Sequence, residues 1–207
     1  MPRTNVKGLY LLTEDGADDV RLGAVVRQAL GAGLKWLQYR DKSRDAARRL
    51  RQAGLLAQWC RDADAHLLIN DDVALAKMVN AAGVHLGQHD GDLAAARAML
   101  GPNAVIGASC YNDLELARSA IEAGASYLAF GAMYASGTKP LARSCPHEVL
   151  TAARGFGLPI VAIGGITPDN AGSVYTAGAD AIAVLGCVWQ ADDAVSVIKR
   201  FSAMEPK

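Results

Sequence analysis

The chain has 207 residues, of which 51% are hydrophobic and 20% charged, so it can fold around a large core and is not of the disordered class. Its 21 Lys and Arg residues balance its 21 Asp and Glu residues, which argues against the overall basic field that nucleic acids or anionic membranes attract. No apolar run approaches the roughly 20 residues that a bilayer span needs. We therefore expect residues 1–207 to form one soluble domain.

The cysteines are far apart and have neither the spacing of a zinc site nor that of a small disulfide-rich domain. They are Cys60, Cys110, Cys145 and Cys187. Reduced thiols are typical of cytoplasmic proteins. Residues 1–8 lack the apolar core of a signal peptide, so we expect a cytoplasmic protein.

Short apolar segments with the character of buried strands recur eight times along the chain. In chain order they cover residues 8–13, 34–40, 66–71, 83–88, 104–109, 127–134, 159–165 and 181–186. Most are separated by Ala- and Leu-rich stretches with helical spacing, such as residues 46–63 and 113–125. The alternation predicts an α/β protein.

Turn residues mark where several of these helices begin and end. In residues 167–180 we expect Thr167 to cap a helix, with Pro168 in its first turn and Gly178 at its end. Gly124 is expected to end the helix before the sixth strand. Eight strand–helix units in a chain of this length predict a single, compact (β/α)8 TIM barrel. A doubly wound open sheet is the alternative.

Polar and small residues gather at the carboxyl-terminal ends of seven of the predicted strands. Active sites of (β/α)8 barrels are built at this end, from the loops that follow the strands. We therefore predict one site at this rim. In chain order its candidate residues are Gln38, Arg40 and Lys42; Asn70, Asp71 and Asp72; Gln88 and Asp90; Ser109; Ser136, Thr138 and Lys139; Gly164 and Gly165; and Gly186.

The charges at this rim favour binding of a metal ion and a diphosphate. Asp71 and Asp90 could hold Mg²⁺, which prefers carboxylate oxygens and shares its remaining ligands with water and substrate phosphates. Asp71 could instead only cap the helix that follows it. Beside Arg40, Lys42 and Lys139, the metal site is the stronger hypothesis, because three cations and a metal suit an anion with more charge than one phosphate.

The glycines after the seventh and eighth strands indicate a second anion site, because glycine lets backbone N–H groups approach a phosphate closely. Two anion sites imply two phosphorylated substrates. No Ser–His–Asp or Cys–His arrangement is evident from the spacing. His85 lies inside an apolar stretch, and we expect it to be a hydrogen-bonded core residue.

Several motifs together resemble those of the thiamine phosphate synthase (thiamine-phosphate pyrophosphorylase) family. In chain order they read "QYRDK", "IND", "GVHLGQHD", "IGAS", "GTK", "AIGGI" and "GADAIAVLG". The resemblance implies a transferase that joins 4-amino-2-methyl-5-(diphosphooxymethyl)pyrimidine to a thiazole phosphate. The diphosphate leaves first, and the thiazole ring nitrogen then attacks the carbon, so no general base is needed.

The resemblance also assigns roles to individual residues. It implies Mg²⁺ at Asp71 and Asp90. Pyrimidine diphosphate contacts would fall on Gln38, Tyr39, Arg40, Asp41, Lys42, Asn70, Ser109 and Lys139, of which Arg40, Lys42, Ser109 and Lys139 would take part in catalysis. Thiazole phosphate contacts would fall on Ser136, Gly137, Thr138, Gly165, Leu185 and Gly186. Strand alternation places Gln38 and Arg40 on the face toward the barrel mouth, and Tyr39 on the face toward the helices.

The departures from the family pattern lie on the thiazole side. The family commonly has a loop like "GPIFPTxTK" after the sixth strand, where this chain reads "GAMYASGTK". A family serine after the eighth strand is Gly186 here, which removes one hydroxyl. They motivate one alternative, a regulator that binds thiamine-pathway metabolites without turnover. A second alternative is an isomerase like the family's thiazole tautomerase relatives, against which the complete set of pyrimidine diphosphate residues argues. We expect only small-molecule partners, with no nucleic acid and no membrane.

Overall fold

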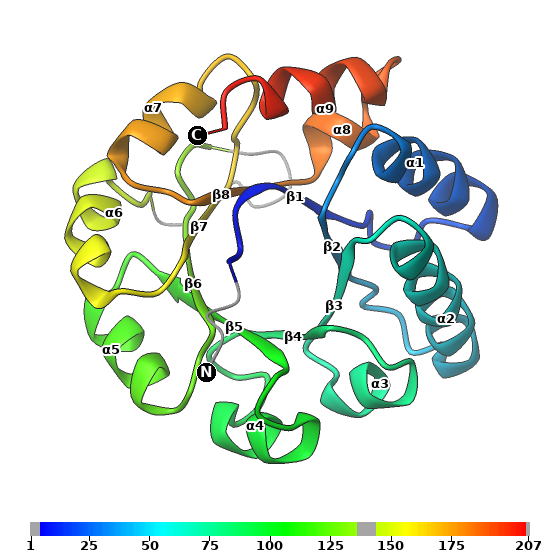
Figure 1. Ribbon diagram of the computed structural model, residues 1–207, viewed down its shortest axis with the longest axis horizontal. Coiled ribbons are helices and arrows are strands. Elements are labelled where there is room, and N and C mark those ends of the chain that lie inside the picture. Colours follow the sequence, from blue (N-terminus) through cyan, green and yellow to red (C-terminus); the bar gives the residue numbers. More distant parts are fainter. Residues whose placement is uncertain (1–4, 136–143, 206–207) are drawn as a thin grey trace.

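Parallel strands close into a barrel in the computed structural model, in which residues 5–135 and 144–205 are described and contain eight strands (Figure 1). Each strand pairs with its neighbours in chain order, and β8 pairs with β1. The strands are β1 (Gly8–Leu12), β2 (Trp36–Tyr39), β3 (His66–Asn70), β4 (Gly83–Leu86), β5 (Val105–Tyr111), β6 (Tyr127–Phe130), β7 (Ile160–Ile163) and β8 (Ala181–Val184). The predicted (β/α)8 TIM barrel is thus confirmed, and the open sheet is excluded.

Helices surround this barrel and cover the outer face of its strands (Figure 1). They are α1 (Asp19–Gly31), α2 (Ala46–Asp62), α3 (Val73–Met78), α4 (Leu93–Leu100), α5 (Leu114–Glu122), α6 (His147–Ala153), the 3₁₀ helix η1 (Arg154–Phe156), α7 (Ala171–Ala177), α8 (Gly186–Trp189) and α9 (Ala194–Ser202). Among the described residues, no helix has both the length and the apolar character to span a bilayer.

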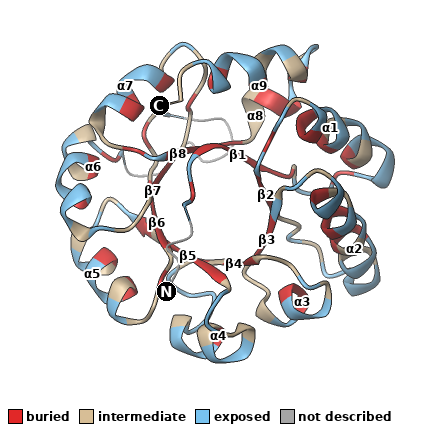
Figure 2. Cartoon of the chain, viewed as in Figure 1, coloured by how far each residue is buried: buried red, intermediate tan, exposed pale blue. Residues whose placement is uncertain are grey.

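The strands are buried on both faces, which explains their nearly continuous apolar sequences. One cluster of buried residues lies between the strands and the helices, and a second, which includes Tyr10, Trp36, Leu68 and Tyr127, fills the barrel interior. Val6, in the segment that leads into β1, is fully buried in this inner cluster. Figure 2 shows the result as a ring of buried strands inside helices whose outer faces are exposed.

Aspartates cap six of the helices, and each accepts a hydrogen bond from a backbone N–H in the first turn. They are Asp18, Asp45, Asp72, Asp92, Asp113 and Asp193. At the carboxyl end of β3, the cap of α3 is Asp72, whose Oδ1 accepts from Leu75 N at 2.8 Å. The neighbouring Asp71 does not have to cap this helix.

The predicted helix ends were correct in two places and wrong in one. Gly178 ends α7 and Gly124 follows the end of α5, both with positive φ. Thr167 is not the cap of α7, which begins at Ala171. Residues 167–170 form a separate turn instead, in which Asn170 Oδ1 accepts from Thr167 N at 2.9 Å. The side chain of Asn170 thus satisfies the backbone of Thr167 before the helix starts.

Candidate active site

A cavity of about 1200 Å³ lies at the carboxyl ends of the strands, where the sequence predicts the site. It is lined by predicted residues from six strand ends: Gln38, Arg40, Lys42, Asn70, Asp71, Gln88, Asp90, Ser109, Gly164, Gly165, Leu185 and Gly186. The predicted residues Ser136, Gly137, Thr138 and Lys139 fall outside the residues that the structure describes. The barrel thus brings together groups that are up to 148 positions apart (38 to 186).

The wall after β2 carries the cations. Arg40 Nη1 lies 3.2 Å from Asp15 Oδ2, and the backbone N–H of Lys42 donates to Asp15 Oδ1 at 2.7 Å. The Lys42 ammonium forms an ion pair with Asp71. Sequence reasoning missed Asp15, which lies in the loop after β1 and holds both cationic residues in place. The acidic run that includes Asp15, at the same rim, was the available signal.

Tyr39 and Asp41 point away from the cavity, toward the helices. The Tyr39 hydroxyl donates to Gln52 Oε1 on α2 at 2.9 Å. The Asp41 carboxylate accepts from Arg48 at 2.7 Å and from Ser43 N at 2.8 Å. Burial acts to raise the pKa of Asp41, but the hydrogen bonds from Ser43 and Arg48 and the positive charge of Arg48 together outweigh it and lower that pKa. The side chains of Tyr39 and Asp41 therefore stabilise the β2–α2 loop from behind the cavity wall.

Two carboxylates face the cavity at the ends of β3 and β4. Asp71 has a φ of 63°, a left-handed conformation that aspartate tolerates better than most residues, and its N–H donates to the His85 carbonyl at 2.9 Å. Asp90 lies over Gly87, where an added Cβ would come within 2.4 Å of Asp90 Oδ2. Gly87 thus leaves the space that the Asp90 carboxylate occupies.

This acidic pair fits a hard divalent cation such as Mg²⁺. Both candidate donors are carboxylates that line the same cavity. Mg²⁺ is commonly bound by one or two carboxylates, with water and substrate phosphates as the other ligands. A site with two protein carboxylates beside Arg40 and Lys42 matches that coordination.

A chain of hydrogen bonds crosses the cavity floor. Gln38 Nε2 lies 2.9 Å from the Tyr10 hydroxyl, which lies 3.1 Å from the Tyr127 hydroxyl. His85 Nδ1 is 2.8 Å from that second hydroxyl, and His85 Nε2 is 2.9 Å from Ser109 Oγ. Burial raises the pKa of both tyrosines, so they keep their protons at neutral pH. His85 is hydrogen-bonded as the sequence predicted, but it also lines the cavity.

The opposite side of the mouth is built from glycine. Gly164 and Gly165 have φ values of 106° and 62°. A Cβ at Gly165 would come within 2.5 Å of the Ala135 carbonyl oxygen, so only glycine fits there without movement of the chain. Gly186 is the first residue of α8. Backbone N–H groups are therefore available to bind an anion on this side, beside the side chains of Thr167 and Gln190.

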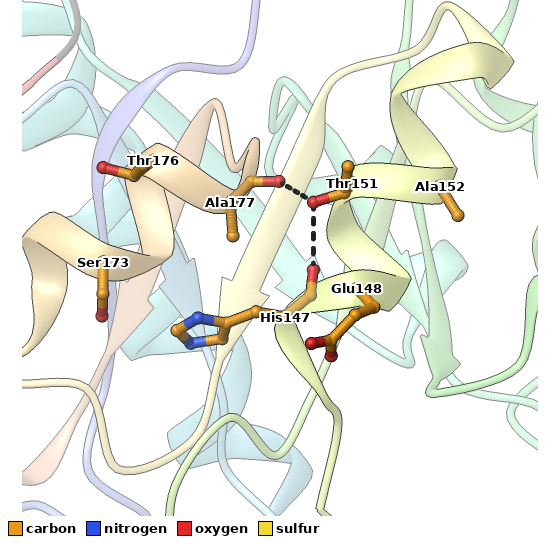
Figure 3. A pocket seen from close by; sticks show the side chains of 7 residues that line it. All are labelled: His147, Glu148, Thr151, Ala152, Ser173, Thr176 and Ala177. Carbon is orange, nitrogen blue, oxygen red and sulfur yellow. Dashed lines mark hydrogen bonds between the residues drawn. The ribbon is translucent and has the colours of Figure 1, made fainter.

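A second, open hollow lies between α6 and α7 (Figure 3). Its hydroxyl groups are bonded to main-chain carbonyls: Thr151 Oγ1 donates to Ala177 O at 3.0 Å, Thr176 Oγ1 to Gly172 O at 2.9 Å, and Ser173 Oγ to Asn170 O at 2.8 Å. The bonds of Ser173 and Thr176 lie within α7 and its cap, and that of Thr151 joins α6 to α7. The hollow offers no set of catalytic groups comparable to the barrel mouth.

All four cysteines are free thiols, as predicted. Cys60, Cys110 and Cys145 are buried and Cys187 is half-buried. Burial raises the pKa of Cys60 and Cys110 to about 12, and that of Cys145 and Cys187 to about 11. Burial thus disfavours the thiolate form of each cysteine, which argues against a cysteine nucleophile.

Comparison with known proteins gives one consistent result. The family model described as thiamine monophosphate synthase matches residues 9–188. The thiamine-phosphate synthase of Chromobacterium violaceum is 55% identical to this chain, over 94% of this chain and 94% of the relative. That of Methylobacillus flagellatus is 50% identical, over 95% of this chain and 94% of the relative. The solved structure of thiamine phosphate pyrophosphorylase from Pyrococcus furiosus is 34% identical, covers 97% of this chain and 96% of its own, and superimposes with a TM-score of 0.84.

Proposed function

The chain belongs to the thiamine monophosphate synthase family, and on that premise we propose how its barrel mouth carries out the reaction. The enzyme is a transferase that makes thiamine phosphate and releases diphosphate. Its substrates are the aminopyrimidine diphosphate and a thiazole phosphate. One observation carries the residue assignment: the cations after β2 and the carboxylates after β3 and β4 line one cavity.

The side of the cavity after β2–β5 binds the pyrimidine diphosphate. Arg40 and Lys42 bind the diphosphate oxygens, and Asn70 and Ser109 contact the pyrimidine end. Lys139 is proposed as a third cation. Asp71 and Asp90 would hold Mg²⁺, which when bound would supply Lewis-acid stabilisation of the charge on the leaving diphosphate. Lys42 pairs with Asp71 in the structure. Bound diphosphate would offer Lys42 a new partner of opposite charge, and a bound metal would offer one to Asp71.

The reaction needs charge stabilisation more than proton transfer. As the C–O bond to diphosphate breaks, negative charge grows on the leaving group, and Arg40 and Lys42 stabilise it from fixed positions. Asp15 bonds the Arg40 guanidinium and the backbone N–H of Lys42, so the segment that carries both cations is held in place before the substrate binds. The thiazole nitrogen attacks through its lone pair. Burial raises the pKa of Cys187, which lines the cavity, in agreement with a mechanism that uses no cysteine nucleophile.

The thiazole phosphate binds on the glycine side. Gly165, Leu185 and Gly186 line this part of the cavity, and backbone N–H groups there would bind the phosphate. Ser136, Gly137 and Thr138 are proposed to complete the site. Because Gly186 replaces a family serine, one hydroxyl donor is missing. A neutral hydrogen bond contributes about 0.5–1.5 kcal/mol, so binding is weakened but not abolished.

The protein is proposed to work as one barrel domain in the cytoplasm, with small molecules as its only substrates. Its balanced charge and its buried free thiols support this proposal.

Mixing the two substrates with the purified protein tests the proposed chemistry. We expect thiamine phosphate, detected by mass, together with one equivalent of diphosphate when Mg²⁺ is present, and little product after chelation with EDTA. Full activity in EDTA would contradict the metal assignment. Isomerised thiazole phosphate without condensation would instead identify a tautomerase, and binding of both compounds without any product would identify a regulator.

A further inference from the structure

The hydrogen-bond chain under the cavity connects two parts of the side that the proposed function assigns to the pyrimidine diphosphate. Gln38 lies on β2 and Ser109 on β5, and these strands are separated around the barrel by β3 and β4. Tyr10 of β1, Tyr127 of β6 and His85 of β4 connect them through four consecutive hydrogen bonds of 2.8–3.1 Å. Gln38, Tyr10 and Tyr127 are at most 3% exposed, so these bonds lie largely out of solvent.

One direction of the chain uses every hydroxyl proton; the opposite order would leave the proton of the buried Tyr10 hydroxyl without an acceptor among the bonds of this chain. The Gln38 amide nitrogen can only donate, so the Tyr10 oxygen accepts from it. The Tyr10 proton is then available for the Tyr127 oxygen, and the Tyr127 proton for His85 Nδ1. An acceptor at Nδ1 places the proton of a neutral imidazole on Nε2, which donates to Ser109 Oγ. In this arrangement every bond of the chain has one donor and one acceptor.

We propose that Tyr10, Tyr127 and His85 are positioning residues that fix this direction and thereby determine which pyrimidine the enzyme accepts. This inference rests on the proposed function. With the chain in this direction, Gln38 keeps its amide oxygen as an acceptor for the ligand, and Ser109 keeps its hydroxyl proton as a donor. The cavity therefore presents an acceptor at Gln38 and a donor at Ser109.

A 4-aminopyrimidine matches this pattern. Its exocyclic amino group is a donor, and ring nitrogen N1, which lies para to that amino carbon, is an acceptor. The amino group would face Gln38 and N1 would face Ser109. A 4-oxo analogue has an acceptor in place of the amino group, so it would meet the Gln38 oxygen with its own oxygen. To accept this analogue, the enzyme would have to reverse every donor along the chain, including the Gln38 amide.

The His85 tautomer tests the direction without any turnover. The wild-type protein is labelled with ¹⁵N-histidine, and the ring nitrogens are observed by long-range ¹H–¹⁵N correlation at neutral pH. We expect the signals of a neutral ring that is protonated on Nε2. The His85→Gln protein identifies which signals belong to His85. A ring protonated on Nδ1, or on both nitrogens, would overturn the proposal.

Tyr127→Phe tests the effect on specificity, because it interrupts the chain at its centre and keeps the aromatic ring. We expect the KM for the pyrimidine diphosphate to rise roughly ten-fold, the loss expected for about one hydrogen bond, with an unchanged KM for the thiazole phosphate. The preference for the 4-amino over the 4-oxo compound should fall by a similar factor. Tyr175→Phe is the matched control, since the buried Tyr175 hydroxyl has no hydrogen-bond partner within the described part of the chain.

The outcomes separate this inference from the function on which it rests. The positioning role would be overturned if Tyr127→Phe had an unchanged KM for the pyrimidine diphosphate and an unchanged preference for the 4-amino compound. It would also be overturned if the KM values for both substrates rose equally. In either case, turnover by the wild-type protein would still support the synthase. Absence of thiamine phosphate from the wild-type protein would overturn the proposed function. The His85 tautomer would then still report the direction of the chain, and it also decides the matter if Tyr127→Phe does not fold.

Discussion

The two sides of the barrel mouth use different chemical groups. After β2, β3 and β4 the cavity is lined by charged side chains, which are held by ion pairs such as that between Lys42 and Asp71. After β7 and β8 it is lined by Gly164, Gly165 and Gly186, where the backbone itself is the recognition surface. The charged side can lose function by loss of a side chain. The glycine side can lose function when a side chain is added where the backbone is crowded, as at Gly165.

The largest effect is expected from the charged side, at the metal ligands. Asp90→Ala removes one of two carboxylates, and we expect turnover to fall roughly a thousand-fold, because the stabilisation that a bound metal supplies amounts to several kcal/mol. Binding of Mn²⁺, followed by electron paramagnetic resonance, should weaken as well. Asp192→Ala, at an exposed aspartate, is the control and should leave both unchanged. Wild-type turnover in Asp90→Ala would contradict the metal assignment.

Next in size is the loss of a diphosphate contact. Arg40→Ala should lower kcat/KM for the pyrimidine diphosphate about 10- to 100-fold, since a hydrogen bond to a charged group contributes about 1.5–3 kcal/mol. Thiazole phosphate should keep its KM. The matched control is Arg44→Ala, two residues beyond Lys42 and exposed. A larger effect on thiazole phosphate than on the diphosphate substrate would mean that the two sides of the mouth are assigned the wrong way round.

On the glycine side, an added methyl group should harm binding and stability together. Gly165→Ala places a Cβ 2.5 Å from the Ala135 carbonyl oxygen at a φ of 62°. We expect a loss of about 1–3 kcal/mol in the free energy of unfolding and a several-fold rise in the KM for thiazole phosphate. Both are measured directly, by urea denaturation and by steady-state kinetics.

Gly172→Ala is the control for this change. It lies on α7, where an added Cβ meets nothing within 4 Å. Alanine favours a helix over glycine, so this variant should gain up to about 1 kcal/mol in stability and keep wild-type kinetics. If both alanine variants behaved alike, crowding at Gly165 would not be the cause.

The smallest effect is a gain. Gly186→Ser restores the family hydroxyl, and the new Cβ would have no contact closer than 3.8 Å, to Gln190. We expect the KM for thiazole phosphate to fall about two- to ten-fold, the effect of one neutral hydrogen bond. The KM for the pyrimidine diphosphate should not change. Gly186→Ala, which adds the Cβ without the hydroxyl, separates the hydrogen bond from the effect of the added carbon.

The sequence alone determined the barrel and most of its rim. The strands were predictable because buried parallel strands have nearly continuous apolar sequences, and their carboxyl ends lie on one side of a barrel. This rule correctly placed Gln38, Asp71, Asp90, Ser109 and Gly186 around one cavity. Both rules depend only on local sequence and on the order of the elements.

Only the tertiary structure decided which side chains interact. Tyr10 and Tyr127 are 117 positions apart, and nothing near either residue indicates the other; strand register around the closed barrel brings their hydroxyls together. Asp15 likewise acquires its role from the loop after β2, and Asp72 rather than Asp71 takes the helix cap. The direction in which a side chain turns at the end of a strand depends on its partners in space, and these are set only when the barrel closes.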